Sequence, residues 1–171
     1  MQRRAGKATV SRTLPNESRA VALTPRDRIN NRLIFRLFQT ASLYQSTTPR
    51  ELDVSAVQGV ILGALYRDVD RGTSFSDLCG YLAVSRQNLD VVLKRLERIG
   101  YVERVEGEAD RRVKIVRLTR EGVAAWLDLH TRSIEFFRKI TATLSAAEVT
   151  ACADALAKIG RELKASRASS G

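Results

Sequence analysis

The chain has 171 residues, of which 44% are hydrophobic, and its 29 basic and 19 acidic residues give a formal net charge of +10. This length and apolar content are typical of one globular domain with a buried core. No apolar run approaches the roughly 18 residues of a membrane span, and no apolar segment of a secretory signal follows the basic amino terminus. The basic excess favours a polyanionic partner, either nucleic acid or an anionic membrane surface.

Cysteine and histidine are scarce in this sequence. Cys79 and Cys152 are too few and too scattered for a disulfide framework or a metal site, so a reduced, cytoplasmic setting is the default expectation. His130 is the only histidine, and no Cys, Asp or Glu cluster stands near it at ligand spacing. We therefore expect neither a metal nor a cofactor.

The amino-terminal part begins with a basic segment and continues as a helix. Residues 1–24 have no periodic apolar pattern, which predicts a disordered basic arm, either a plain tail or a DNA-contacting arm. Thr24 and Pro25 predict a helix start, as N-cap and first helical residue. The helix expected in residues 25–53 carries so wide an apolar surface that another subunit is a natural partner.

Three shorter helices are predicted next. Ser55 begins a buried helix that includes Val60, and Ser74 caps the following one. After a tight turn through Ala83 and Val84, Ser85 caps a helix that Gly100 ends. Two short helices joined by a few residues, the second with a polar first turn, have the layout of a helix-turn-helix.

A basic hairpin follows this pair of helices. Alternation around residues 113–118 predicts a strand, paired with an earlier strand across a turn at Glu106 to Ala109. The hairpin alone could be a solvated arm. Placed directly after a helix-turn-helix, it completes a winged helix, and its basic residues then indicate contact with DNA: Arg111, Arg112, Lys114, Arg117 and Arg120.

Two more helices, in residues 120–171, are expected to begin at Thr119 and Ser145, with Glu148 completing a capping box at Ser145. Their apolar faces exceed what a monomer needs and suggest a dimerisation layer. The predicted fold is mainly α with a small β-wing. A winged helix-turn-helix in residues 54–119 is flanked by dimerisation helices in residues 25–53 and 120–171.

The order of these elements and one motif resemble the multiple antibiotic resistance regulator (MarR) family over roughly residues 25–165. The motif is D-x-R-x5-L-T-x2-G, formed here by Asp110, Arg112, Leu118, Thr119 and Gly122. The resemblance implies a symmetric dimer on a pseudo-palindromic double-stranded operator, with recognition helices in major grooves and wings in minor grooves. It further implies that Arg112 enters the minor groove while Asp110 holds its guanidinium.

Candidate DNA contacts lie on the recognition helix and the wing. The exposed first turn of the recognition helix would present side chains to base edges, since Arg suits guanine and Gln or Asn suits adenine. Later basic residues of that helix would contact phosphates or only solvate it. Val91 stands where relatives often carry a polar residue, so readout there is open. The candidates are Ser85, Arg86, Gln87, Asn88, Lys94, Arg95, Asp110, Arg111, Arg112 and Lys114.

The resemblance also implies a small effector that changes DNA affinity, such as an aromatic acid, a phenol or an acyl-CoA thioester, and favours a repressor. Arginine beside aromatic residues would suit an aromatic carboxylate, although the same residues could be core and solvated surface. The candidates are Arg32, Phe35, Arg36, Phe38, Gln58 and Tyr66.

Other function classes have weaker support. A redox switch needs a primed thiolate, whereas Cys79 and Cys152 fall on apolar helix faces. Non-specific architectural DNA binding fits the charge, and predicts affinity with little sequence preference. The sequence lacks the phosphate loops, serine elbow and His–carboxylate arrangements of enzymes, so we do not expect one.

Overall fold

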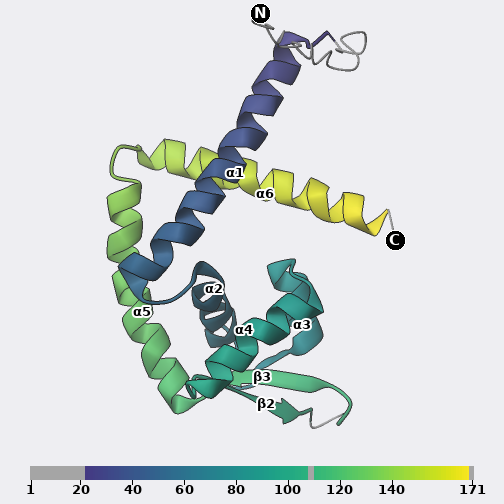
Figure 1. The fold of residues 1–171 in the computed structure, drawn as a ribbon, viewed down its shortest axis with the longest axis vertical. Coiled ribbons are helices and arrows are strands. Elements are labelled where there is room, and N and C mark those ends of the chain that lie inside the picture. Colours follow the sequence, from purple (N-terminus) through teal and green to yellow (C-terminus); the bar gives the residue numbers. More distant parts are fainter. Residues whose placement is uncertain (1–21, 108–109, 170–171) are drawn as a thin grey trace, which may run out of the picture. The chain divides into compact units, whose positions relative to one another are not determined.

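The computed structural model describes residues 22–107 and 110–169 (Figure 1). Most of the basic arm expected in residues 1–24, and Glu108 and Ala109 of the expected turn, lie outside the described residues. The chain divides into two compact units, with the boundary between Ser42 and Leu43. The elements are α1 (Pro25–Leu52), α2 (Ala56–Tyr66), β1 (Thr73–Ser74), α3 (Phe75–Leu82), α4 (Arg86–Arg98), β2 (Val102–Glu106), β3 (Lys114–Leu118), α5 (Arg120–Ile140) and α6 (Ala146–Ala168).

Local capping explains where the helices begin. Each predicted N-cap oxygen accepts a hydrogen bond from the backbone N–H three residues later, which satisfies a donor that the helix itself leaves unpaired. At the start of α1, the Thr24 hydroxyl accepts the Asp27 N–H, and the Asp27 carboxylate accepts the Thr24 N–H in return. The predicted N-caps are confirmed: Ser55, Ser74, Ser85, Thr119 and Ser145.

The turn between α3 and α4 gives the helix-turn-helix its geometry. Ala83 has a left-handed backbone, with φ of 54°, and its N–H bonds back to the end of α3. α4 ends shortly before Gly100, whose φ of 78° is favourable for glycine, as predicted.

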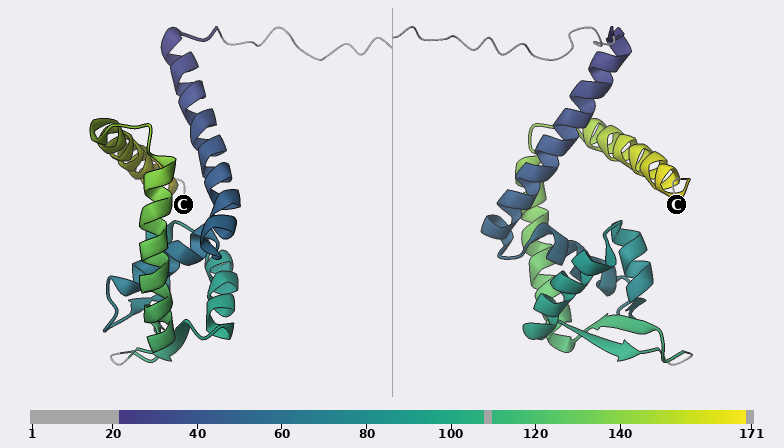
Figure 2. Two further views of the ribbon diagram at one scale, coloured as in Figure 1. Left: turned by 90° about the vertical axis from the view of Figure 1, so that its left-hand side faces the viewer. Right: turned by 45° about the vertical axis from the view of Figure 1, so that its right-hand side comes forward.

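The sheet has three antiparallel strands in the order β1-β3-β2. The sequence pattern does not predict strand β1, because Thr73 and Ser74 are recognisable as a strand only through their pairing with Val116 and Ile115. The turn predicted at Glu106 to Ala109 is too short: Glu106 still pairs with Lys114, so the connection runs from residue 107 to 113. Figure 2 shows the β2–β3 hairpin projecting from the base of the helices.

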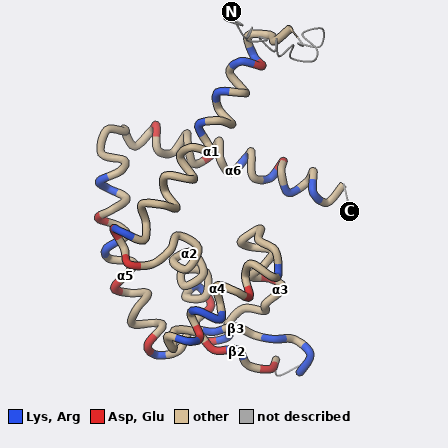
Figure 3. Tube along the Cα trace, viewed as in Figure 1, with Lys and Arg blue, Asp and Glu red and all other residues tan. Residues whose placement is uncertain are grey.

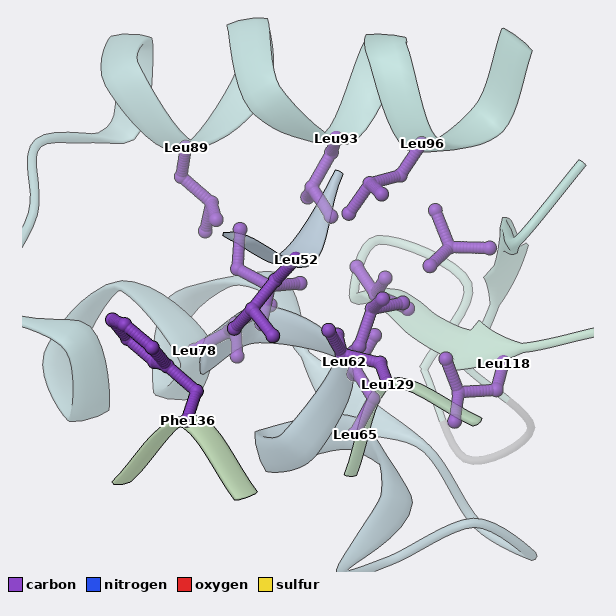
Figure 4. Close-up of a cluster of buried hydrophobic side chains, with 13 residues drawn as sticks. Leu52, Leu62, Leu65, Leu78, Leu89, Leu93, Leu96, Leu118, Leu129 and Phe136 are labelled. Carbon is purple, nitrogen blue, oxygen red and sulfur yellow. The ribbon is translucent and has the colours of Figure 1, made fainter. Parts of the chain in front are cut away.

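The core of the second unit lies where α4 meets the other helices. Figure 4 shows Leu89, Leu93 and Leu96 of α4 pointing toward Leu62 of α2 and Leu52 at the end of α1. All of them are buried. Burial of one such side chain contributes about 1.5–3 kcal/mol to stability, so this cluster fixes α4 on its support.

Some predicted core positions are exposed instead. Val60 is 46% exposed because it faces a cavity rather than the core. α6 buries none of its side chains within the described residues, and Cys152, expected on its inner stripe, is exposed. The apolar residues of α6 therefore remain available to a partner. No helix in residues 22–107 and 110–169 combines the length and apolar character needed to cross a bilayer.

Candidate nucleic-acid interface and ligand cavity

The first turn of α4 presents polar side chains to solvent. Arg86, Gln87 and Asn88 are exposed, while Leu89 turns into the core. The hydroxyl of Ser85 accepts the backbone N–H of Asn88 at 3.2 Å, so this side chain is already used as a cap. Gln87 and Asn88 are thus the residues of this turn best placed to read base edges.

Arg86 lies against α3. Its Nη1 donates to Ser76 Oγ at 3.2 Å, and its guanidinium carbon is 5.3 Å from the ring centroid of Phe75. The same side chain lines a hollow of about 320 Å³ together with Arg112 and Lys114. This position between helix and wing suits contact with a DNA phosphate as well as with a base.

Arg104, which is absent from the predicted site residues, joins the wing to the recognition helix. From β2, its Nη1 donates to Asp90 Oδ1 at 2.6 Å, and its Nε lies 3.0 Å from Glu97 Oε1. The Nε contact is an ion pair without hydrogen-bond geometry. The guanidinium also lies 5.7 Å from the Phe75 ring centroid. One half-buried side chain therefore links α3, α4 and β2.

These cations lower the pKa of the Asp90 carboxyl below its ordinary value of 3.8. The hydrogen bond from Lys94 is the largest cause, followed by that from Arg104. Lys94, a predicted DNA contact, lies 2.9 Å from Asp90. Lys94 is largely exposed, and such surface pairs contribute at most about 1 kcal/mol, so it can exchange this carboxylate for a phosphate.

The wing is only partly neutralised by acidic residues. Lys114 pairs with Glu106 at 3.1 Å, and Arg117 pairs with Glu103 at 2.8 Å. Arg95, Arg111 and Arg112 are exposed and have no carboxylate within 4.0 Å among the described residues. Figure 3 shows Lys and Arg along the hairpin and α4.

Asp110 makes a different contact from the one that the resemblance implied. Its Oδ1 accepts the backbone N–H of Arg112 at 2.8 Å, and within the described part of the chain no ion pair joins it to the Arg112 guanidinium. The Val113 N–H donates to the Asp110 carbonyl at 3.0 Å. Asp110 therefore shapes the turn of the wing through the backbone of Arg112 and, among the described residues, forms no ion pair with its guanidinium.

A cavity of about 390 Å³ lies in the second unit, between the end of α1, α2 and α5. Its walls are mainly apolar and aromatic, with a few polar groups. Arg132 of α5 secures one side, since its Nη1 donates to the Leu52 carbonyl at 3.2 Å and lies 3.3 Å from Asp53 Oδ2. The lining includes Tyr44, Thr48, Val60, Arg67, Tyr81, Trp126, His130, Ser133 and Phe137.

Two glycines of α2 make room for this cavity. Gly59 and Gly63 are one turn apart on the side of α2 that faces α5. A β-carbon at Gly63 would lie 2.7 Å from Cη2 of Trp126, so a larger residue would displace the indole. Trp126 also stacks on His130, with ring centroids 5.3 Å apart. The packing of α2 against α5 thus gives the cavity an aromatic wall formed by Trp126 and His130.

Arg67, at the C-cap of α2, is the only lysine, arginine or carboxylate on the lining of the cavity in the described part of the chain. Its Nη1 donates to the Tyr81 hydroxyl at 2.9 Å, and its guanidinium carbon lies 5.4 Å from the centroid of the Tyr81 ring. Tyr81 belongs to α3. The cavity therefore touches the helix-turn-helix through this pair.

Comparison with known proteins identifies the family. The family model described as "MarR family" matches residues 52–113. Over 139 residues the chain is 37% identical to the transcriptional activatory protein BadR of Rhodopseudomonas palustris, covering 78% of this chain and 79% of BadR. The chain belongs to the MarR family. It is therefore a transcriptional regulator and not an enzyme.

Solved MarR-family structures share the fold. A mutant of MarR from E. coli, in complex with operator DNA, is 26% identical with a TM-score of 0.66, and the match covers 80% of this chain and 99% of that one. AbsC from Streptomyces coelicolor has a TM-score of 0.72 at 22% identity, covering 85% and 99% of the two chains. The winged helix-turn-helix predicted from the sequence is confirmed.

The predicted ligand residues of this MarR-family chain are not brought together within one unit. Gln58 has its Oε1 occupied by the Ser55 N–H at 2.9 Å, and Tyr66 packs on Trp126 at 6.1 Å between ring centroids. Neither lines the cavity, which is built from second-unit residues. The others lie on α1 in the first unit, where their part in ligand binding stays a prediction: Arg32, Phe35, Arg36 and Phe38.

The residues predicted from the sequence do not include Arg67, Tyr81 and Trp126, which line the cavity. A signal for them was present, because Gly59, Gly63 and Arg67 recur every fourth residue and so share one face of a helix. Small residues on a helix face leave space beside it, and the arginine marks one end of that space. Cys79 is half-buried against the core, as its apolar setting predicted.

Proposed function

We propose that this protein is a homodimeric regulator that binds a specific pseudo-palindromic operator and changes its DNA affinity when a small molecule occupies the cavity. The observation that carries the DNA-binding part is the link made by Arg104. It holds the exposed turn with Gln87 and Asn88 next to the basic hairpin before any DNA is present. A preorganised surface loses less conformational entropy on binding.

On the operator, Gln87 and Asn88 read base edges in the major groove, and Arg112 enters the minor groove. Arg86, Lys94, Arg95, Arg111 and Lys114 supply further contacts to the DNA, mainly to phosphates. Phosphate contacts fix the register of the protein, whereas base contacts choose the sequence. The protein acts in the cytoplasm, where it meets this DNA.

A second copy of the chain covers the apolar surfaces that the monomer leaves open. Large apolar side chains are exposed on α6, among them Val149, Leu156 and Leu163, and Phe35 and Phe38 are exposed on α1. Large exposed apolar side chains on each of these helices support an interface with another chain. Two-fold symmetry then matches the two halves of a pseudo-palindrome.

The effector is a small aromatic acid, a phenol or the CoA thioester of such an acid. A volume of about 390 Å³ falls in the range of small-molecule sites, about 300–1,000 Å³, and the apolar walls with few polar groups are typical of them. In this setting Trp126, Tyr44 and Phe137 form aromatic walls, while Thr48, Ser133 and Arg67 supply polar contacts.

The sign of regulation has two candidates. The sequence resemblance favours a repressor that the effector releases from its operator. The name of the 37% identical relative, an activatory protein, favours activation as the second candidate. The sign depends on where the operator lies relative to the promoter.

A reporter experiment decides between them. The promoter region beside the gene is fused to a reporter in cells with and without the protein, and each class of effector is added. Repression predicts low expression that an effector raises, and activation predicts expression that requires the protein. Expression independent of the protein and of every effector would contradict regulation of this promoter.

A further inference from the structure

We propose that Arg67 receives the acidic group of the effector, and that Tyr81 transmits the loss of its arginine partner to the DNA-binding helices. This inference rests on the proposed function, namely that a small acid binds in the cavity. It goes further by naming the residue that distinguishes an acid from its neutral analogue and the contact through which binding alters α3.

The electrostatics of the cavity favour Arg67 as the receiver. Arg67 has no carboxylate within 4.0 Å in the described ranges, and its guanidinium donates to the hydroxyl of Tyr81. Arg67 and Tyr81 are both exposed, so an incoming acid can reach the guanidinium, and the preference for an acid rests on its charge and on the geometry of its two oxygens. A carboxylate can accept two parallel N–H bonds from arginine, whereas a phenol oxygen accepts a single weaker one. An acid in the cavity therefore outcompetes Tyr81.

The position of the pair connects the cavity to the helix-turn-helix. A second hollow of about 250 Å³ lies beside the cavity, and Ala64, Arg67 and Tyr81 line both. These three residues thus form the wall between the two spaces. In the second hollow, Asp77 is held by Ser74, whose hydroxyl donates to Asp77 Oδ2 at 2.7 Å. When an acid draws the Arg67 guanidinium into the cavity, Arg67 no longer contributes to the wall between the two hollows.

Tyr81 stands where a small movement reaches α4. It is in the last turn of α3, two residues before Ala83, whose left-handed backbone directs the chain into α4. When a carboxylate takes Arg67, Tyr81 loses both the N–H donated to its hydroxyl and the cation over its ring. The end of α3 is then less firmly held on α2, and α4 with its base-reading turn follows. The effector binds more tightly when the Arg67–Tyr81 contact is broken, and DNA binds more tightly when it is intact. This difference couples effector binding to DNA binding.

The contact predicts a difference between acids and their amides. An amide of the same shape fills the apolar space but gives Arg67 no charged partner, so it leaves the Arg67–Tyr81 contact intact. We expect the acid to bind up to about fivefold more tightly than the amide, since an ion pair at an exposed arginine contributes at most about 1 kcal/mol. Only the acid should weaken DNA binding.

Trp126 makes occupancy of the cavity directly measurable, because it lines the cavity and is the only tryptophan in the chain. Benzoate, 4-hydroxybenzoate, phenylacetate and cinnamate are each titrated against their amides while Trp126 fluorescence is followed. Benzoyl-CoA is included as a thioester without a carboxylate. The acid with the largest fluorescence change is then tested for release of operator DNA by fluorescence anisotropy.

Three variants separate the two roles. Arg67→Gln should lower the affinity for the acid to that for the amide, whereas Arg71→Gln, at an exposed arginine near the end of α2, removes the same charge and should change nothing. Tyr81→Phe should bind the acid at least as tightly as the wild type, because the competing phenol is gone. Acid bound to Tyr81→Phe should release the operator less than in the wild type. Thermal unfolding verifies that each variant is folded.

The outcomes are distinguishable. Equal affinity for acid and amide, or an unchanged Arg67→Gln, overturns the role of Arg67. Full DNA release in Tyr81→Phe overturns the role of Tyr81. Release by benzoyl-CoA alone overturns the acid receiver but leaves a ligand-responsive regulator. If no compound changes either Trp126 fluorescence or DNA affinity, the small-acid effector itself is wrong and the inference fails with it.

Discussion

The backbone of Gly122 packs directly against the backbone carbonyl of Tyr101, so closely that a β-carbon on Gly122 would overlap the carbonyl oxygen. The same carbonyl accepts the Thr119 N–H at 3.1 Å, and the Thr119 hydroxyl donates to the Gly100 carbonyl at 2.6 Å. The start of α5 is therefore fastened to the turn that follows α4. This joint explains the L-T-x2-G half of the motif as a structural requirement.

Replacing Gly122 with alanine should destabilise the protein by about 1–3 kcal/mol, the usual cost of forcing an extra carbon into a packed site. Urea unfolding followed by circular dichroism measures this. Gly80→Ala is the matched control, since nothing lies within 4 Å of a β-carbon there and alanine favours helices by about 0.5–1 kcal/mol. A Gly122→Ala protein as stable as the wild type would contradict this role of the joint.

Asp110 should tolerate asparagine but not alanine. Asparagine keeps a side-chain oxygen that can accept the Arg112 N–H, so operator affinity should change by less than about threefold. Alanine removes the acceptor and should weaken binding about threefold to tenfold through a looser wing turn. Anisotropy titrations at one salt concentration test both. If asparagine were as harmful as alanine, the charge of Asp110, and not its turn contact, would be what matters.

Arg112→Ala and Gln87→Ala should change DNA binding in different ways. Arg112→Ala should weaken binding and relax the preference for A·T-rich flanks, because narrow minor grooves attract arginine electrostatically. Gln87→Ala should alter preference within the major-groove half-site, where a good base contact is worth about 1–3 kcal/mol. Binding to a library of operator variants measures both profiles. A uniform loss for Gln87→Ala, or unchanged affinity for Arg112→Ala, would remove that residue from its assigned role.

Asp90 should make stability depend on pH in the acid range. Its pKa in the folded protein lies below 3.8, so its contribution is present above that value and is lost as pH falls further. The wild type should be more stable than Asp90→Asn from pH 7 down to about 4, and the difference should shrink below pH 3.8. Urea midpoints from pH 7 to pH 2.5 follow it. The lowered pKa values of Asp27 and Glu148 affect both proteins alike. If the stability difference between wild type and Asp90→Asn stayed constant down to pH 2.5, the lowered pKa of Asp90 would be contradicted.

Local features of the fold were predictable from the sequence. The N-caps at Ser55, Ser85 and Thr119 depend on contacts three residues apart, which the sequence displays directly. β1 was not predictable in this way, since its residues become a strand only by pairing with β3 across more than forty positions of chain.

The site was predicted less completely than the fold. The recognition helix and wing follow from element order, but the contact of Arg104 with Asp90 depends on how β2 packs against α4. The sequence D-x-R is compatible both with an ion pair and with the backbone contact of Asp110. Arg67 and Tyr81 are fourteen residues apart on different helices, so only the packing of α3 on α2 brings them together.

The most direct test of the account is competition binding to DNA. Fluorescence anisotropy measures the affinity of the full-length protein for DNA from immediately upstream of its own gene, with a random duplex of equal length as competitor at one fixed salt concentration. A specific operator binder should prefer the upstream DNA by about 10³-fold or more. Equal affinity for both duplexes would contradict specific binding at this site and would favour charge-driven, architectural binding.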